Sequence, residues 1–431
     1  MRHQCIILAD QPSAELCGIS LLERLLRQLQ RLGLAKAIVL SSAPEVFAHD
    51  LANPSPHRSR VAVEIRGRAS GPVTARQIVE AWPNDARSVI VIRGEAVFDS
   101  RLLELLDAQD STAVLVDSAP PENLRSLVVS APTTSRGRLC GAVLLARDWS
   151  SNQVASLDAA LRQDVEAGRI EAFDIASRVW YSRELRRDLR PYWFRSPAAA
   201  QRAAAASVLL TAAQKGAQDF PALVHAPIEN FLVSHLCKTA ITPNQLTVFS
   251  NVVAWGATLL FATGQLAAGT ALALAVGILD GLDGKQARIK VETSKTGKLE
   301  HWFDALFEIS WWIALAYYFR NSGRLPAAWS YLALLLSAEA AAGLAKLSVI
   351  RRCGRLIDEM GGFDRIVRLF AGRRNIYVWL FALGVLFQVP AVAFTIIAWW
   401  AAATAAFQVP RAIFLVRVFG GKGLRETSVE A

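Results

Sequence analysis

Short apolar runs alternate with helical patterns over the first 195 residues. Residues 5–9 (CIILA), 37–40 (AIVL) and 88–92 (SVIVI) are runs typical of buried strands. Residues 21–33 (LLERLLRQLQRLG) have apolar positions at helical spacing, and residues 102–106 and 157–161 also favour helices. Strands that alternate with helices predict a three-layer α/β domain with a mostly parallel sheet. We expect this domain to occupy residues 1–190.

The second half of the chain has apolar stretches that are each close to the length of a membrane-spanning helix. There are six, at residues 246–264, 268–287, 299–319, 326–348, 376–389 and 391–414. Residues 191–244 are expected to be a linker with an alanine-rich helix and an amphipathic segment at 231–238 that suits the membrane surface. The pattern therefore predicts an all-α, six-helix transmembrane domain at residues 245–416, followed by a cytoplasmic tail at 417–431.

Positive charge is distributed unevenly between the loops of this second half. The chain has 431 residues, of which 53% are hydrophobic, and a formal net charge of +10. Lys and Arg concentrate at residues 285–298, 350–375 and in the tail, whereas the opposite loops carry few beyond Arg320 and Arg324. Because positively charged loops stay in the cytoplasm, both termini are expected to be cytoplasmic in an integral membrane protein. This topology accounts for the basic balance, so no nucleic-acid partner is expected.

Acidic residues interrupt the apolar pattern at two neighbouring places. Asp280 and Asp283 share a helix face, on which Gly284 and Ala287 leave space. A second predicted helix, beginning near residue 299, carries Asp304 and Glu308 at i, i+4 spacing. Four bare carboxylates on apolar helices carry a large desolvation cost, which divalent cations would relieve. Solvated acids at two helix ends are the alternative, but they do not explain four acids in register with small residues beside them.

The segment from residue 280 to residue 308 resembles the signature of the CDP-alcohol phosphotransferase family, D-x2-D-G-x2-A-R-x8-G-x3-D-x3-D. The matching positions are Asp280, Asp283, Gly284, Ala287, Arg288 and Gly297. After Gly297 the strict spacing falls on His301 and Ala305, but the chain has three extra residues before Asp304 and Glu308. Three residues turn a helix by about 300°, so both acids return to roughly the expected face. Glu also replaces Asp at the last position, which lengthens that side chain.

The resemblance implies a membrane-embedded phosphotransferase that uses a CDP-alcohol donor, either a CDP-diacylglycerol or a CDP-polyol. It implies two Mg²⁺ (or Mn²⁺) ions held by Asp280, Asp283, Asp304 and Glu308 at the cytoplasmic side of the bilayer. Asp304 and Glu308 are the implied catalytic residues, and Glu308 is the base that takes the proton from the acceptor hydroxyl. CMP is the leaving group in this reaction.

The same resemblance implies the nucleotide contacts. Its nucleotide-binding positions correspond here to Asn244, Thr247, Gly284, Ala287 and Arg288. Arg373 and Arg374 would hold the acceptor if it is a phosphorylated polyol; their alternative role is to anchor a helix at the lipid headgroups. The acceptor's identity and the oligomeric state, including a homodimer, stay open.

The N-terminal domain resembles the sugar-phosphate nucleotidyltransferases over residues 19–40 and 89–106. That family has a Gly-rich, basic first loop, whereas residues 10–15 here (DQPSAE) contain two acids and no Gly or Arg. Glu95 stands where the family has a metal-binding Asp, and Asp174 is the candidate second acid. An acidic loop repels a triphosphate, so we expect a degenerate domain. A pseudoenzyme that acts as a binding module, and a bifunctional cytidylyltransferase and phosphotransferase, are the two alternatives.

Overall fold

The computed structural model describes residues 3–10, 14–52, 59–149, 155–216, 219–292 and 297–419, with the side chains of residues 49–52 and 297–304 left out of the description. The described chain forms two compact units. The first contains residues 1–215 together with 233–240 and 285–293, and the second contains 216–232, 241–284 and 294–431. Each unit is described on its own below.

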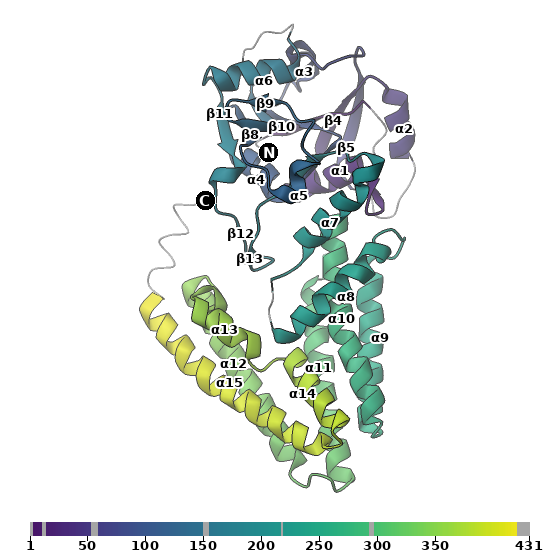
Figure 1. Ribbon diagram of the computed structural model, residues 1–431, viewed down its shortest axis with the longest axis vertical. Helices are drawn as coiled ribbons and strands as arrows, with labels where there is room; N and C mark the ends of the chain where they lie inside the picture. Colours follow the sequence, from purple (N-terminus) through teal and green to yellow (C-terminus); the bar gives the residue numbers. More distant parts are fainter. Residues whose placement is uncertain are drawn as a thin grey trace. The chain divides into compact units, whose positions relative to one another are not determined.

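A mixed sheet forms the centre of the first unit (Figure 1). Its main strands, in spatial order, are β11 (Glu171–Asp174), β8 (Ala113–Asp117), β10 (Gly137–Ala146), β6 (Ser88–Arg93), β1 (Gln4–Leu8), β4 (Lys36–Ser41) and β5 (Ala62–Gly67). Neighbouring strands are parallel except at β10, which runs antiparallel to β6 and β8. The predicted α/β domain with a mostly parallel sheet is therefore confirmed.

Helices cover both faces of this sheet, α3 and α6 on one side and α1 and α4 on the other (Figure 1). Serine, threonine and aspartate caps begin them: Ser20 accepts from Glu23 N, Thr74 and Gln77 form a capping box, Asp99 accepts from Arg101 N, and Ser156 accepts from Ala159 N. The helices are α1 (Leu21–Arg31), α2 (Pro44–Ala52), α3 (Ala75–Ala81), α4 (Ser100–Asp107), α5 (Glu122–Arg125), α6 (Leu157–Glu166) and α7 (Arg202–Ala213).

Short strands complete the first unit. They pair as β2 (Glu15–Leu16) with β3 (Ile19–Ser20), β7 (Ala96–Phe98) with β14 (Trp193–Arg195), β9 (Thr133–Thr134) with β10, and β12 (Tyr181–Ser182) with β13 (Arg187–Asp188). Short 3₁₀ helices occur at Ile175–Ser177 and Ala199–Gln201.

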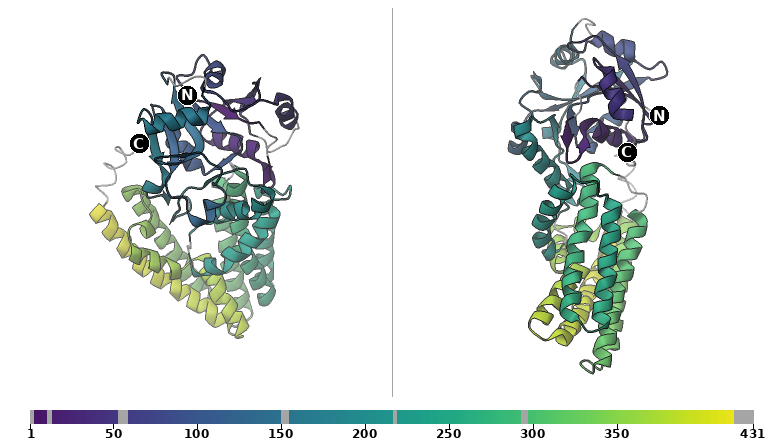
Figure 2. Two further views of the ribbon diagram at one scale, coloured as in Figure 1. Left: turned by 45° about the horizontal axis from the view of Figure 1, so that its top comes forward. Right: turned by 90° about the vertical axis from the view of Figure 1, so that its right-hand side faces the viewer.

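Long helices build the second unit: α8 (Phe220–Leu236), α9 (Pro243–Ala262), α10 (Leu266–Lys290), α11 (Gly297–Asn321), α12 (Ala328–Cys353), α13 (Gly362–Phe370), α14 (Arg374–Leu386) and α15 (Pro390–Phe419), with a 3₁₀ turn at Ile357–Glu359. The last residues of α8 and of α10 are grouped with the first unit. Helix α11 packs against α9 and α12, and α12 runs along α15 (Figures 1 and 2). The segment 350–375, expected to be a loop, contains the 3₁₀ turn and α13.

Five segments are long and apolar enough to cross a membrane: Pro243–Ala262, Leu266–Lys290, Ala328–Cys353, Gly362–Leu386 and Pro390–Phe419. They agree with five of the six expected spans and support a helical membrane domain. The remaining expected span, 299–319, lies within α11, whose first side chains fall outside the description. The count of six and the cytoplasmic orientation stay predictions.

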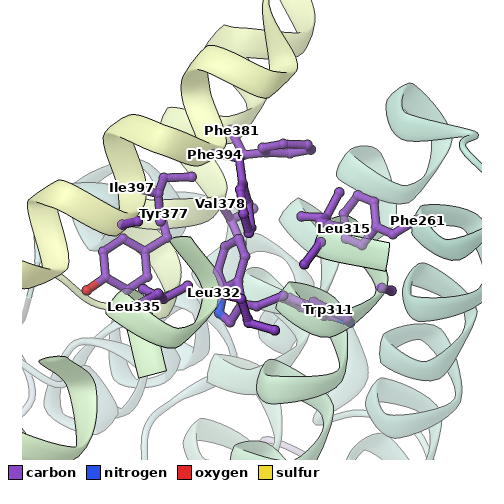
Figure 3. Close-up of a cluster of buried hydrophobic side chains, with 14 of the residues drawn as sticks. Phe261, Trp311, Leu315, Leu332, Leu335, Tyr377, Val378, Phe381, Phe394 and Ile397 are labelled. Carbon is purple, nitrogen blue, oxygen red and sulfur yellow. The ribbon is translucent and has the colours of Figure 1, made fainter. Parts of the chain in front are cut away.

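Aromatic and aliphatic side chains from α9, α11, α12, α14 and α15 form the core of the helical unit (Figure 3). The rings of Phe261 and Phe381 meet edge-on with centroids 5.7 Å apart. The buried Trp311 donates its indole N–H to the carbonyl of Ala254 at 2.8 Å, which joins α11 to α9. This packing holds the ends of α9, α10, α11 and α14 in place, and these ends carry the predicted site.

Candidate functional site

The polar start of α9 is built by local sequence. Thr242 and Gln245 form a reciprocal capping box, and Pro243 occupies the first turn, where its missing N–H costs nothing. This places Asn244 and Thr247 on the first two turns of the helix. Asn244 is exposed, whereas Thr247 is half-buried and faces α10.

Among the predicted ligands whose side chains the structure describes, Asp283 is the most buried. It is 5% exposed, and its Oδ2 accepts a hydrogen bond of 2.6 Å from the Thr247 hydroxyl. Its Oδ1 accepts from the backbone N–H of Gly284 at 2.5 Å. Two accepted hydrogen bonds fix the orientation of this buried carboxylate. The structure therefore brings together Thr247, Asp283 and Gly284, which were predicted separately as nucleotide and metal positions.

Asp280, one turn earlier on α10, pairs with Arg374. The Arg374 Nη2 donates to Asp280 Oδ2 at 2.5 Å, and the guanidinium lies 5.3 Å from the ring centroid of Phe307. Because Phe307 is on α11 and Arg374 begins α14, three helices meet at this carboxylate. Arg374, which was predicted to hold the acceptor, lies directly beside a predicted metal ligand.

Helix α8 and the residue that precedes it contribute polar side chains that were not predicted. Asp219, His225 and Glu229 are buried. The Glu229 carboxylate packs so closely against Gly281 that a Cβ added to this glycine would lie 2.3 Å from Oε1. A Cβ on Gly277 would likewise lie 3.0 Å from the His225 ring. The absence of side chains at these two glycines allows α8 to approach α10 next to the acids. Burial lowers the pKa of His225, although the nearby Glu229 and Asp219 act to raise it.

Exposed apolar residues occupy the other side of α8: Phe220, Leu223, Val224, Ile228 and Phe231. Polar groups turned inward and apolar groups turned outward are the arrangement of a helix that lies in the membrane interface. The amphipathic segment expected at 231–238 therefore overlaps the end of a longer helix, α8. The exposed apolar residues of α8 lie between residues 220 and 231, mostly before the expected segment. The helical spacing of these apolar residues in the sequence could have predicted the longer amphipathic helix.

Glu308, the predicted base, is half-buried on α11. Lys346 of α12 lies within electrostatic range of Glu308, Glu339 and Arg373. The Tyr377 hydroxyl donates to Glu339. Lys346 and Glu339 interrupt the apolar stretch 326–348, and ionisable residues inside a membrane helix commonly mark a substrate path. These two charged residues within an apolar stretch could have identified Lys346 as a candidate site residue from the sequence.

The remaining predicted residues have other described contacts or lie outside the described side chains. Ala287 and Arg288 belong to the first unit, where Arg288 donates to the carbonyl of Ala213 at 2.9 Å and pairs with Glu184 at 3.8 Å. Arg373 is half-buried at the N-cap of α14. Asp304 is in α11, among the residues whose side chains lie outside the description.

Asp280 and Asp283 offer oxygen ligands of the kind that Mg²⁺ and Mn²⁺ prefer. They are one turn apart on one helix, and Asp283 is oriented by its hydrogen bonds, so this pair fits a divalent cation. Within the described side chains, which exclude Asp304, no three His, Cys, Asp or Glu groups gather as a complete ligand set. The metal assignment is therefore a proposal, taken up below.

The N-terminal unit has a cavity of about 450 Å³ at the ends of β1 and β6, lined in part by Asp10, Arg93, Glu95 and Arg195. Glu95 pairs with Arg195 at 2.8 Å, and Arg93, whose closer partner is Asp158 at 2.5 Å, lies 3.9 Å from Glu95, so arginines already offset its charge. Asp174 does not line this cavity. Burial favours a higher pKa for Asp174, but hydrogen bonds from Ser118 and from the Ala176 N–H outweigh it and lower that pKa. The two candidate acids thus have separate structural partners.

Residues 240–409 match the family model described as CDP-alcohol phosphatidyltransferase. This segment is a CDP-alcohol phosphatidyltransferase domain. It covers less than half of the chain and contains the Asp280–Arg374 and Asp283–Thr247 contacts. The family predicted from the acidic motif is therefore confirmed for this domain. Membership of this family supports the prediction that the domain is a transferase.

Solved structures resemble each part of the chain. The phosphatidylinositol phosphate synthase of Mycobacterium tuberculosis with CDP-DAG bound has 17% identity and a TM-score of 0.34, covering 44% of this chain and 94% of that one. The inositol-1-phosphate CTP transferase from T. maritima has 12% identity and a TM-score of 0.33, covering 47% and 94%. HddC from Yersinia pseudotuberculosis, complexed with GMP-PN, has 13% identity and a TM-score of 0.33, covering 48% and 99%. No curated protein matches the chain.

Proposed function

We propose that the domain at residues 240–409 transfers a substituted phosphoryl group from a CDP-alcohol to an acceptor hydroxyl and releases CMP. The observation that carries this proposal is the Asp283 carboxylate, buried between α9 and α10 and held by Thr247 in a domain of the CDP-alcohol phosphatidyltransferase family. The donor class is a CDP-diacylglycerol or a CDP-polyol, as the acidic motif implies. Phospholipid or phosphodiester synthesis is the corresponding role.

Asp280, Asp283, Asp304 and Glu308 are the residues that would hold the Mg²⁺ or Mn²⁺ ions. When bound, two such ions would neutralise the donor pyrophosphate and the charge that develops on the attacking and leaving oxygens. The contribution of this chain is to orient the ligands. Thr247 and the Gly284 N–H orient Asp283, and Arg374 balances Asp280.

Glu308 is proposed to take the proton from the acceptor hydroxyl. The hydroxyl oxygen forms a new bond to the phosphorus that carries the alcohol, and the bond from that phosphorus to the CMP oxygen breaks. CMP leaves with the electron pair of the broken bond, and the proton stays on Glu308 until it passes to solvent. Lys346 and Arg373, which lie within electrostatic range of each other, suit an anionic acceptor such as a phosphorylated polyol.

The nucleotide end of the donor is proposed to lie against Asn244, Thr247, Gly284, Ala287 and Arg288. Gly284 follows Asp283 and leaves space beside it, while Asn244 is exposed at the start of α9 and supplies an amide. The protein is proposed to have six spans in the bilayer, with both termini and this site on the cytoplasmic side. Accessibility of single cysteines in intact cells would test that orientation.

The experiment is a CMP-release assay on the full chain in lipid vesicles with Mg²⁺. CDP-diacylglycerol and CDP-inositol are each offered with a panel of polyols and polyol phosphates. We expect one donor and acceptor pair to release CMP and form the matching phosphodiester. A folded protein that releases no CMP with any pair, under conditions in which it binds a CDP-alcohol, would favour the alternative of a binding module without catalysis.

A further inference from the structure

Helix α13 has its polar and apolar sides reversed relative to a helix on a water-soluble protein. Its apolar residues Phe363, Ile366 and Phe370 follow i, i+3, i+7 spacing and are 62%, 60% and 54% exposed. The ring of Phe370 stacks with that of Phe220 on α8, with centroids 6.4 Å apart. A continuous apolar strip of this kind marks contact with a membrane or a partner.

Two of the three charged residues of α13 point into the protein, whereas Arg365 is exposed. Asp364 is 3% exposed and accepts two hydrogen bonds from Arg411 of α15, from Nε at 2.8 Å and from Nη2 at 2.7 Å. Arg368 is buried and pairs with Asp358 of the preceding 3₁₀ turn. These pairs fix the rotation of α13 about its own axis, so its apolar side faces away from the protein.

An apolar groove of about 350 Å³ lies between α13 and α15. Ile366 and Phe370 line one wall, and Trp400, Ala403 and Phe407 line the other. The indole N–H of Trp400 donates to the carbonyl of Phe370 at 2.9 Å, so this polar group is satisfied and the ring presents its apolar surface. Both walls belong to segments that are long and apolar enough to cross a membrane, Gly362–Leu386 (divided into α13 and α14) and Pro390–Phe419, so we infer a lipid environment around the groove.

The groove ends next to the proposed acceptor site. Thr404, at this end, accepts a hydrogen bond of 2.8 Å from the N–H of Gly372, and Arg373 is the next residue. A chain in the groove would therefore have its polar end near the start of α14, where Arg373 is the N-cap residue. A glycerophospholipid has this combination, with an unbranched apolar chain joined to an anionic phosphate.

We propose that the α13–α15 groove binds one acyl chain of a bilayer glycerophospholipid, with the phosphate end toward Gly372 and Arg373. The reversed polarity of α13, its fixed rotation and the apolar lining all support a lipid chain as the occupant. The groove is separate from the Asp280 and Asp283 carboxylates, whereas its polar end shares Arg373 with the proposed acceptor site. Binding of an acyl chain in the groove is expected whether or not the domain transfers a phosphoryl group.

The test is photolabelling in vesicles of phosphatidylethanolamine and phosphatidylglycerol. The probe is a phosphatidylglycerol with a diazirine on one acyl chain, and labelled peptides are identified by mass spectrometry. We expect stronger labelling at residues 366–370 and 400–407 than at residues 392–399 of α15, whose exposed Val392, Ile396 and Trp399 report ordinary lipid contact. Equal labelling of both regions would overturn the proposal.

Two matched substitutions on α15 sharpen the test. Ala403→Phe fills the groove and should lower its labelling to the level of residues 392–399. Ala406→Phe adds the same ring at an exposed position outside the lining and should leave the labelling unchanged. Unchanged labelling in a folded Ala403→Phe protein would contradict the proposal. If that variant does not fold, the smaller Ala403→Leu replaces it in the same comparison.

A second copy of the chain is the competing occupant. Cysteine at position 403 (Ala403→Cys) should react with a maleimide-bearing lipid analogue in the vesicles and should form no crosslinked dimer. A crosslinked dimer through position 403, with no lipid labelling, would show that the groove is an interface between copies.

Discussion

The hydrogen bond between Thr247 and Asp283 gives the sharpest test of the proposed site. Thr247→Val keeps the shape of the side chain and removes the hydroxyl that donates to Asp283 Oδ2 at 2.6 Å. Asp283 is 5% exposed, so little water can replace the lost donor. The carboxylate would keep its hydrogen bond from the Gly284 N–H but lose the contact that ties it to α9.

The size of the effect follows from the charge of the acceptor. A hydrogen bond to a charged group contributes about 1.5–3 kcal/mol, more than a neutral one. If that contribution orients Asp283 for its cation, then kcat/KM should fall about 10- to 100-fold, because 1.4 kcal/mol corresponds to about a factor of ten. The Mg²⁺ concentration for half-maximal CMP release should rise as well. A change in donor KM alone would assign Thr247 to nucleotide binding.

Thr258→Val is the matched control on the same helix. The Thr258 hydroxyl contacts Ser310 at 2.8 Å, a neutral partner, so its loss should leave the Mg²⁺ dependence unchanged. Thr247→Ser, which keeps the hydroxyl, should restore most of the activity. The assay measures CMP release against Mg²⁺ and donor for all three variants. If Thr247→Val keeps the wild-type Mg²⁺ dependence and kcat/KM, or if Thr258→Val loses as much, the role given to Thr247 is wrong.

Further predictions concern the acids. Asp283→Asn should lower CMP release by about 100-fold or more at fixed Mg²⁺, since one ligand charge is lost; unchanged turnover in a folded variant would refute the metal assignment. Removal of divalent cations by a chelator should abolish CMP release and Mg²⁺ or Mn²⁺ should restore it, whereas activity that persists would exclude the two-ion proposal. Glu308→Gln should abolish transfer with CDP-alcohol binding retained, and Glu308→Asp should cost less because the proton acceptor is kept; near wild-type release by Glu308→Gln would show that Glu308 is not the base. The full chain should form no pyrophosphate from CTP and a polyol phosphate, because the loop at residues 10–15 is acidic and arginines offset the charge of Glu95; pyrophosphate release that disappears in Glu95→Gln or Asp174→Asn would support the bifunctional alternative.

Local patterns in the sequence determined the secondary structure of both units. The strands at residues 5–9, 37–40 and 88–92 were predicted because a buried strand needs only a short apolar run. The spacing of Asp280 and Asp283 likewise placed both on one face of α10, since helical geometry is set by hydrogen bonds between residues four apart. The family followed from the same local motif.

Residues far apart in sequence were brought together only by the tertiary structure. Asp280 meets Arg374, 94 residues later, and Asp283 meets Thr247, 36 residues earlier. The structural role of glycines 277 and 281 is apparent only from the close approach of α8 to α10 at these positions. No periodicity encodes such contacts, because they depend on which helix faces meet and on the cost of leaving a buried charge without a partner.

The same distinction explains α13. Its apolar spacing can be read from the sequence, and by itself it favours a helix with its apolar side on the protein core. The structure reverses that orientation, since Asp364 pairs with Arg411 of α15 and Arg368 pairs with Asp358. Periodicity determines which residues share a face, whereas the direction of that face is decided by the partners that pair with its charges and by the medium on the other side.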